Sequence, residues 1–194
     1  MTTPPPPAKD PASPVGRDEV VAAALTAAAE LFADRGVSAT SIRDIAARSK
    51  VNHGLIYRHF GTKEQLVGAV LDHLGGRLTT LLDDGGPADE IERNMDQHMR
   101  VMARALLDGY PIGRLQTRFP GVTRLLEQVL PDYDDERDGR LAVANAVALQ
   151  LGWRFFEPFL KAATGLDPIS DDDVRAAVSA EIAQILDPGD ASAV

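Results

Sequence analysis

The feature that most constrains this fold is the spacing of its apolar residues, which follows a helical period along almost the whole chain. In residues 17–36 apolar side chains recur at intervals of three and four, and the segment ends at Gly36, a residue type common directly after helices. No segment shows the apolar–polar alternation of a half-buried strand. The pattern therefore predicts an all-α protein. Further helices are expected within residues 40–49, 53–60, 62–84, 88–109, 114–130 (with a break at Pro120), 135–165 and 170–187.

Residue types at the expected helix boundaries agree with this pattern. Either Thr40 or Ser41 can cap the helix that follows, and Ser41 with Asp44 resembles a capping box, in which two residues satisfy backbone amides reciprocally. Asn52 and Thr62 are the expected N-caps of the next two helices, because their side-chain oxygens can accept from free backbone amides.

Composition limits the class of protein. The chain of 194 residues is 44% hydrophobic, enough for a buried core, and it contains no cysteine, which excludes disulfides and thiolate metal sites. Residues 1–16 include four consecutive prolines but no apolar run typical of a signal peptide. No apolar run approaches the roughly 18–20 residues that span a membrane. We therefore expect a soluble, cytoplasmic protein with no membrane partner, and we interpret residues 1–16 and 188–194 as tails.

Charge is distributed unevenly along the chain. The formal net charge of −9 arises in residues 77–194, whereas residues 17–76 contain equal numbers of basic and acidic side chains. Within residues 40–63, five basic side chains accompany a single acid, Asp44. A solvated basic face would give the same pattern. A local basic patch is nevertheless what contact with phosphates needs, and an acidic remainder discourages indiscriminate binding to nucleic acid.

Residues 51–66, VNHGLIYRHFGTKEQL, place a glycine inside a short predicted helix. Val51, Ile56 and Phe60 are its expected inward anchors, which leaves rings, a cation and bare backbone on the outer face. A glycine within a helix costs about 1 kcal/mol relative to alanine, a cost that makes sense if the backbone at Gly54 approaches another surface closely. Together with the two preceding helices, this short helix fits a helix-turn-helix.

Residues 36–66, GVSATSIRDIAARSKVNHGLIYRHFGTKEQL, resemble the DNA-binding segment of the tetracycline-repressor (TetR) family of bacterial transcriptional regulators. The shared pattern is glycine, threonine and Ile-Ala, then Gly-x-x-Tyr-x-His-Phe, and finally a Lys-Glu pair that opens the next helix. The resemblance implies a helix-turn-helix DNA-binding domain over residues 17–62 and a helical effector-binding and dimerisation domain over residues 63–187.

The resemblance also implies which residues contact DNA. Gly54, Tyr57 and His59 match positions of DNA contact in the family, and Lys63 matches a phosphate-binding lysine. Thr40 matches a position at the N-terminus of the second helix, where the helix dipole and a hydroxyl both favour a phosphate. The full expected DNA-binding set is Thr40, Ser41, Lys50, Asn52, His53, Gly54, Leu55, Tyr57, Arg58, His59 and Lys63.

One departure from the family pattern lies in the turn before the recognition helix. The family commonly has Ala-Gly-Val there, and this chain has Ser-Lys-Val at residues 49–51. Either Lys50 adopts a left-handed backbone conformation, at a cost of roughly 1 kcal/mol, or the turn differs and alters the tilt of the helix. In either case Lys50 can gain a phosphate contact. The resemblance further implies that Asn52, His53 and Leu55 set the operator preference.

Residues 63–187 exceed what a helix-turn-helix needs. The last two long helices carry more apolar and alanine surface than a monomer requires, so we expect a homodimer with a four-helix interface. Three methionines lie within residues 95–102, and methionine suits cavities that accept varied apolar molecules. Ordinary core packing is the other explanation for these side chains. The expected ligand-binding set is Met95, His98, Met99, Met102, Trp153 and Phe156.

Two other classes of protein fit parts of the sequence. An all-α enzyme is disfavoured, because the sequence shows no nucleophile–base pair, zinc or diiron motif, or phosphate loop. A helix-turn-helix that has become a protein-interaction module would suit the acidic net charge. We expect instead a homodimeric repressor, cytoplasmic and associated with the nucleoid, that binds a near-palindromic operator and a largely apolar effector. No catalytic residue, metal or cofactor is expected.

Overall fold

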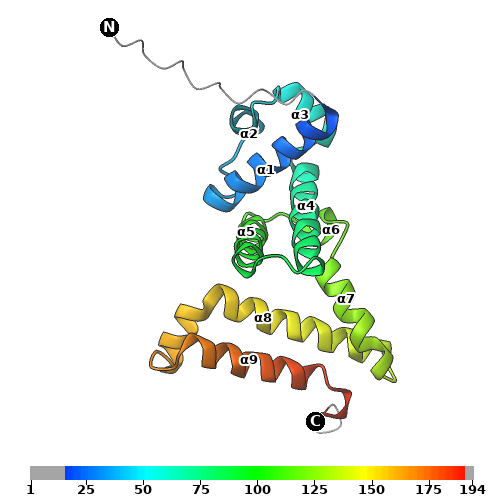
Figure 1. Cartoon of the computed structure of the whole chain (residues 1–194), viewed down its shortest axis with the longest axis vertical. Helices are drawn as coiled ribbons and strands as arrows, with labels where there is room; N and C mark the ends of the chain where they lie inside the picture. The colour runs from blue at the N-terminus through cyan, green and yellow to red at the C-terminus, as the bar shows by residue number, and fades with distance from the viewer. Residues whose placement is uncertain (1–15, 191–194) are drawn as a thin grey trace. The chain divides into compact units, whose positions relative to one another are not determined.

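The computed structural model describes residues 16–190, and over this range it is helical without any strand, as predicted (Figure 1). Most of each predicted tail, residues 1–15 and 191–194, lies outside the described residues. The α-helices are α1 (Arg17–Arg35), α2 (Ile42–Ser49), α3 (His53–Phe60), α4 (Lys63–Asp83), α5 (Ala88–Leu107), α6 (Ile112–Leu115), α7 (Pro120–Val129), α8 (Glu136–Thr164) and α9 (Asp171–Ile185), with short 3-10 helices η1 (Leu130–Asp132) and η2 (Pro188–Asp190).

The boundaries expected from residue types are confirmed at four helices. Ser41 caps α2 and forms the capping box with Asp44. Asn52 caps α3, and Thr62 caps α4 in a second capping box. The break expected at Pro120 is present, because α7 begins at that proline, whereas the preceding helix α6 is Ile112–Leu115 and residues 116–119 are not helical. These boundaries depend on local hydrogen bonds, which is why the sequence predicts them well.

Contacts divide the chain after Phe119 into two units, the first containing α1–α6 and the second α7–α9. The boundary expected at residues 62/63 falls at Thr62, the N-cap of α4, inside the first unit. As a boundary between a DNA-binding and an effector-binding function, it stays a prediction.

The first unit is built around α1, which contacts α2, α3, α4 and α5. Ala24, Ala28 and Phe32 of α1 are fully buried, and the small alanine side chains allow the neighbouring helices to approach closely. The same core contains Ile56 of α3 and Val101 of α5. The helix-turn-helix therefore shares one hydrophobic core with the helices that follow it.

Two ion pairs join α1 to α2 on the surface of this unit. Arg48 contacts Glu30 at 2.7 Å, and Arg35 contacts Asp44 at 3.0 Å. Exposed pairs of this kind contribute about 0–1 kcal/mol each, so they orient α2 more than they stabilise it. The hydrogen bonds from Ser41, and then the charge of Arg35, lower the pKa of Asp44.

The middle of α4 fixes the segment that follows α6. A Cβ atom on Gly68 would overlap the carbonyl oxygen of Leu115, so this close approach requires glycine. One turn later, the Asp72 carboxylate accepts the backbone N–H groups of Thr117 and Arg118, each at 3.0 Å. Packing and hydrogen bonding thus attach the end of the first unit to α4.

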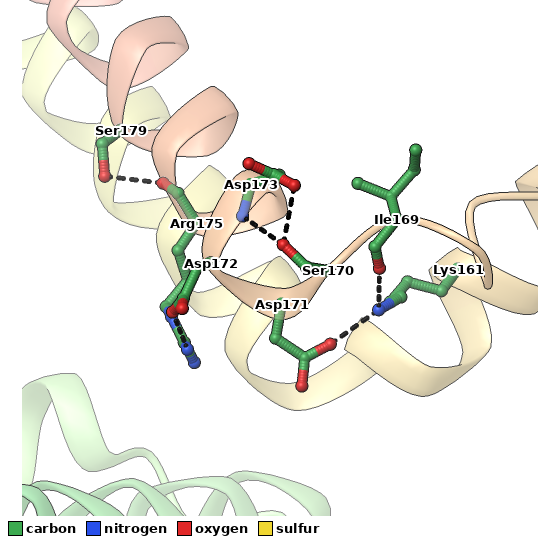
Figure 2. A network of polar contacts seen from close by, with 8 residues as sticks. All are labelled: Lys161, Ile169, Ser170, Asp171, Asp172, Asp173, Arg175 and Ser179. Carbon is green, nitrogen blue, oxygen red and sulfur yellow. Dashed lines mark hydrogen bonds and ion pairs between the residues drawn. The ribbon is translucent and has the colours of Figure 1, made fainter.

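In the second unit, α8 and α9 lie side by side and α7 packs against α8 (Figure 1). Figure 2 shows how the turn between α8 and α9 is closed: the ammonium of Lys161 donates to the carbonyl of Ile169 at 2.8 Å and to Asp171 at 2.6 Å. Ser170 caps α9 by accepting the N–H of Asp173 at 3.1 Å. Three aspartates in the first turn of α9 are favoured there by the helix dipole.

Candidate nucleic-acid interface

The N-terminus of α3 is fixed by Asn52, whose side-chain oxygen accepts the N–H of Gly54 at 2.8 Å. A Cβ atom on Gly54 would lie 3.1 Å from that oxygen and would crowd the cap. Gly54 is otherwise exposed, so its backbone is open on the outer side of α3. Another molecule can therefore approach the helix axis closely at this point.

The two sides of α3 differ as the sequence predicts. Val51 and Ile56 are buried, with 5% and 1% of their surface exposed, and Phe60 is half-buried against the core. On the other side, Leu55 and Tyr57 are 38% and 65% exposed. The expected contact residues of this outer face are all exposed: Asn52, His53, Gly54, Leu55, Tyr57 and Arg58.

This face has the chemistry that DNA recognition uses. The Tyr57 hydroxyl and the Arg58 guanidinium can donate to phosphates or to base edges, and Leu55 can contact a thymine methyl group. His59 is half-buried, with its ring at the edge of Phe60 and 6.4 Å between ring centroids, so its reach is shorter. A short helix with one open face is the element that enters the major groove in helix-turn-helix proteins.

In the turn before α3, Lys50 adopts the left-handed backbone conformation, the first of the two outcomes expected for this turn. Lys50 has φ 56° and ψ 24°, and it is the one non-glycine residue of the described chain with positive φ. The hydroxyl of the preceding residue, Ser49, donates to the carbonyl of Ile45 at 2.7 Å and stabilises the end of α2. The side chain of Lys50 is exposed, and Lys50 lies shortly before the first residue of α3 in the sequence. The turn therefore keeps the left-handed geometry that glycine would adopt without strain.

The Thr40 hydroxyl points into the protein, and its expected phosphate contact stays a prediction. Thr40 is 1% exposed, and its hydroxyl donates to the carbonyl of Gly36 at 2.7 Å. The physical reason is that Thr40 closes the loop between α1 and α2 from inside, while the neighbouring Ser41 is the N-cap of α2. Ser41 is exposed, and its hydroxyl donates to Asp44 at 2.7 Å. Ser41 is therefore the more accessible of the two candidate contacts at this helix end.

Lys63 is the first residue of α4 and is half-buried. Burial lowers the pKa of Lys63, and the carboxylates of Asp108 and Asp44 oppose that shift. A cation at a helix N-terminus is disfavoured by the helix dipole, whereas a phosphate placed there would be attracted both by the dipole and by the ammonium. The position therefore fits an anion supplied by another molecule.

The expected ligand-binding residues of α5 lie together on one side of the helix. Met95, Met99 and Met102 are half-buried, and His98 is 9% exposed. Neither ring nitrogen of His98 has a hydrogen-bond partner, and burial lowers its pKa. A buried imidazole without a partner is a group that a polar atom of a ligand could satisfy.

The other two expected ligand-binding residues lie on α8, in the second unit. Trp153 is half-buried, and Phe156 is 59% exposed. An exposed ring of this size is not enclosed by its own unit. The six-residue ligand-binding set stays a prediction.

An open polar cavity of about 250 Å³ lies between α4 and α5, and the sequence analysis did not identify it. Arg77 and Glu90 form an ion pair across it at 3.3 Å. The signal in the sequence was the run of polar residues on one face of α5, but the contribution from α4 depends on how the two helices pack. The cavity is lined by Arg77, Glu90, Arg93, Asn94 and Gln97.

Among residues 16–190, no group of three or more histidine, cysteine or acidic side chains is arranged to hold a metal ion. In the same range, every helix is too short or too polar to cross a membrane.

Comparison with known proteins gives one family. A family model described as "Bacterial regulatory proteins, tetR family" matches residues 24–70, from α1 into α4. The HTH-type transcriptional repressor Rv3405c of Mycobacterium tuberculosis strain H37Rv is 63% identical over 175 residues, covering 90% of this chain and 93% of that protein. The HTH-type transcriptional repressor KstR2 of Mycolicibacterium smegmatis is 46% identical over 71 residues, 34% of this chain and 33% of that protein.

Solved structures agree at the level of the fold. A TetR-family transcriptional regulator from Streptomyces coelicolor has a TM-score of 0.50 and 25% identity, covering 88% of this chain and 97% of that chain. A mutant of HlyIIR has a TM-score of 0.54 at 19% identity, covering 89% of this chain and 98% of that one. The sequence motif, the exposed face of α3 and the extended similarity to regulators lead to the same assignment. The chain belongs to the TetR family of DNA-binding transcriptional regulators.

Proposed function

We propose that this protein is a homodimeric repressor that reads its operator with the outer face of α3 and leaves DNA when a small, largely apolar effector binds. The observation that carries the proposal is that α3 has one buried side and one exposed side. Ile56 is buried in the core at 1% exposure, while Tyr57, next to it in sequence, is 65% exposed. A rigidly anchored helix that presents rings and donors outward suits recognition in the major groove.

Basic residues in the elements flanking α3 support phosphate binding. Lys50 precedes α3 and Lys63 follows it, so a basic residue lies on each side of the recognition helix in the sequence. Phosphate contacts set the register on DNA, whereas the side chains of His53 and Leu55 are the candidates for reading bases. Loss of one phosphate contact should lower the salt dependence of binding by about 0.9 in the slope of log K against log salt.

The apolar surface of the second unit supports a dimer. Leu141, Phe156 and Phe159 of α8 are 50%, 59% and 67% exposed. On α9, Val174 is buried, while the alanines at positions 176, 177, 180 and 183 are all exposed. Small residues let helices of two subunits approach closely, so a second copy of this chain is the proposed occupant of the α8–α9 surface.

A twofold-symmetric dimer implies a near-palindromic operator. Its two α3 helices would enter successive major grooves, about 34–36 Å apart. The M. tuberculosis relative is named a repressor, which favours repression over activation for this chain. Cytoplasmic location with the nucleoid follows from this role and is part of the proposal.

The effector is proposed to contact the methionines of α5 with its apolar body. It can release DNA only by binding the DNA-incompetent arrangement more tightly, and a coupling of roughly 1–3 kcal/mol is usual. His98, buried and without a partner for its ring nitrogens, is the candidate for recognising one polar atom of the effector.

The test is selection of bound fragments from sheared genomic DNA of the source organism, followed by in vitro transcription from the recovered promoters. We expect one near-palindromic sequence to be enriched and transcription from it to fall when the protein is added. No enrichment would favour a protein-interaction module, and increased transcription would contradict repression. Sedimentation of the protein alone tests the dimer, with Ala180→Lys expected to shift the equilibrium to monomer and Ala22→Lys, exposed on α1, as the control.

A further inference from the structure

A hydrogen bond joins the end of α5 to the loop between α1 and α2. The Asp108 carboxylate accepts the backbone N–H of Ser38 at 2.6 Å, across 70 residues of sequence. Asp108 is the C-cap residue of α5, and its own N–H donates to the carbonyl of Arg104. The last turn of α5 is therefore connected directly to the segment that leads into the helix-turn-helix.

Packing at the same loop is close as well. Gly36 has φ 89°, a conformation that favours glycine, and a Cβ atom on it would lie 3.4 Å from the Asp108 carboxylate and 3.9 Å from the Arg104 guanidinium. The loop backbone thus lies against two side chains from the final turn of α5. A Cβ atom there would make ordinary van der Waals contacts with both, so the preference for glycine comes from the backbone conformation.

The position of Asp108 is unfavourable for α5 itself. A carboxylate at a helix C-terminus adds negative charge where the helix dipole is already negative. Its contribution to the structure therefore comes from what it contacts outside α5. The Asp108 carboxylate accepts the Ser38 amide and, at longer range, its charge acts on Lys63 and Tyr110.

The loop that Asp108 contacts leads directly into α2. Thr40, two residues after Ser38, donates to the carbonyl of Gly36, and the next residue is the N-cap Ser41. Asp108 also contributes to the charge around Lys63 at the start of α4. One side chain of α5 is therefore linked to two elements that flank the proposed DNA-reading helix.

We propose that Asp108 is a positioning residue for DNA binding: its bond to the Ser38 amide keeps the start of α2 in the arrangement that reads the operator. The proposal rests on the proposed function above, and it deepens it, because α5 also carries Met95, His98, Met99 and Met102. A ligand that shifts α5 along its axis would stretch the bond and lower the preference for the operator.

The experiment compares Asp108→Ala and Asp108→Asn with the wild-type protein for binding to the operator and to a shuffled duplex. Asparagine keeps an oxygen that can accept from Ser38, whereas alanine removes it, and both remove the charge. Asp34→Asn, at an exposed carboxylate near the end of α1, is the control for charge alone. Because Asp108 is exposed, we expect a moderate effect: in Asp108→Ala the ratio of operator to shuffled affinity falls about three- to tenfold.

In Asp108→Asn and Asp34→Asn this ratio should stay within about twofold of the wild-type ratio, since the hydrogen bond is kept or not involved. An unchanged ratio in Asp108→Ala, or an equal loss in Asp108→Asn, overturns the proposal. If the wild-type protein does not prefer the operator, the proposed function fails instead.

A second readout follows the hydrogen bond itself. Exchange of the Ser38 amide hydrogen with deuterium, followed by NMR, should be faster in Asp108→Ala than in the wild-type protein, because the acceptor of that hydrogen bond is lost. Equal exchange rates in the two proteins would show that the bond does not protect this amide in solution and would overturn the proposal independently of DNA.

Discussion

Replacing Lys50 by glycine separates backbone strain from charge in the turn before α3. Lys50 has φ 56° and ψ 24°, a left-handed conformation that costs a residue with a Cβ atom roughly 1–2 kcal/mol. Glycine relieves this cost, but its greater freedom in the unfolded chain returns about 0.5–1 kcal/mol. The net expectation for Lys50→Gly is a rise of about 0.5–1 kcal/mol in the free energy of unfolding, or roughly 1–4 °C in Tm.

Lys50→Ala is the matched control. It removes the same charge but keeps a Cβ atom in the left-handed conformation. We expect Lys50→Ala to be no more stable than wild type, and Lys50→Gly to exceed it by about 1 kcal/mol. The assay is urea unfolding followed by circular dichroism, at one protomer concentration for all variants because dimers unfold with concentration-dependent midpoints.

DNA binding gives the second half of the same test. If Lys50 contacts a phosphate, both variants should lower the slope of log K against log salt by about 0.9, and by equal amounts. Equal stabilities of the glycine and alanine variants would refute the strain argument. Unchanged slopes in both would remove Lys50 from the DNA-contacting set while leaving the strain argument intact.

Four further predictions follow from the same structure. Gly68→Ala should destabilise the protein by about 2 kcal/mol or more through overlap with an α6 carbonyl, whereas Gly76→Ala, with open space around it on the same helix, should be neutral or stabilising in urea unfolding. Lys63→Ala should weaken binding to operator and shuffled DNA alike; a loss confined to the operator would contradict a phosphate contact. Leu55→Ala should change the consensus selected from random DNA, and an identical consensus would count against base contact. Burial lowers the pKa of His98 below its usual value near 6.5, so the unfolded chain binds the proton more readily than the folded protein. The free energy of unfolding should therefore fall as the pH decreases from 6.5 through the folded pKa. In urea titrations at pH 7.5 and 5, His98→Leu should make the difference in free energy of unfolding between the two pH values smaller.

The parts of the fold that depend on neighbouring residues could be predicted from the sequence. The N-caps at Ser41, Asn52 and Thr62 each use a hydrogen bond to a residue two or three positions away. The buried side of α3, with Ile56 at its centre, follows from helical spacing. The strain at Lys50 was one of two stated outcomes, because sequence alone does not reveal a backbone angle.

The parts that depend on distant residues could not be predicted. The burial of Thr40 arises from the way its loop folds onto Gly36 and Leu31, which no local pattern in the sequence reveals. The ion pair of Arg48 with Glu30 spans 18 residues, and no local pattern identifies it. The hydrogen bond from the Ser38 N–H to Asp108 joins residues that are even further apart in the sequence. The one signal for it in the sequence is the carboxylate at the end of α5, where the helix dipole disfavours negative charge.

The central claim is that the outer face of α3 reads a specific operator. Fluorescence anisotropy tests it most directly, with the DNA just upstream of this protein's own gene titrated against a shuffled duplex at two salt concentrations. We predict tight, salt-sensitive binding of the wild-type protein that prefers the native sequence. We also predict that a His53→Ala, Leu55→Ala double variant loses this preference. Equal binding of the native and shuffled duplexes by the wild-type protein, at both salt concentrations and also with operators recovered by selection, would contradict it.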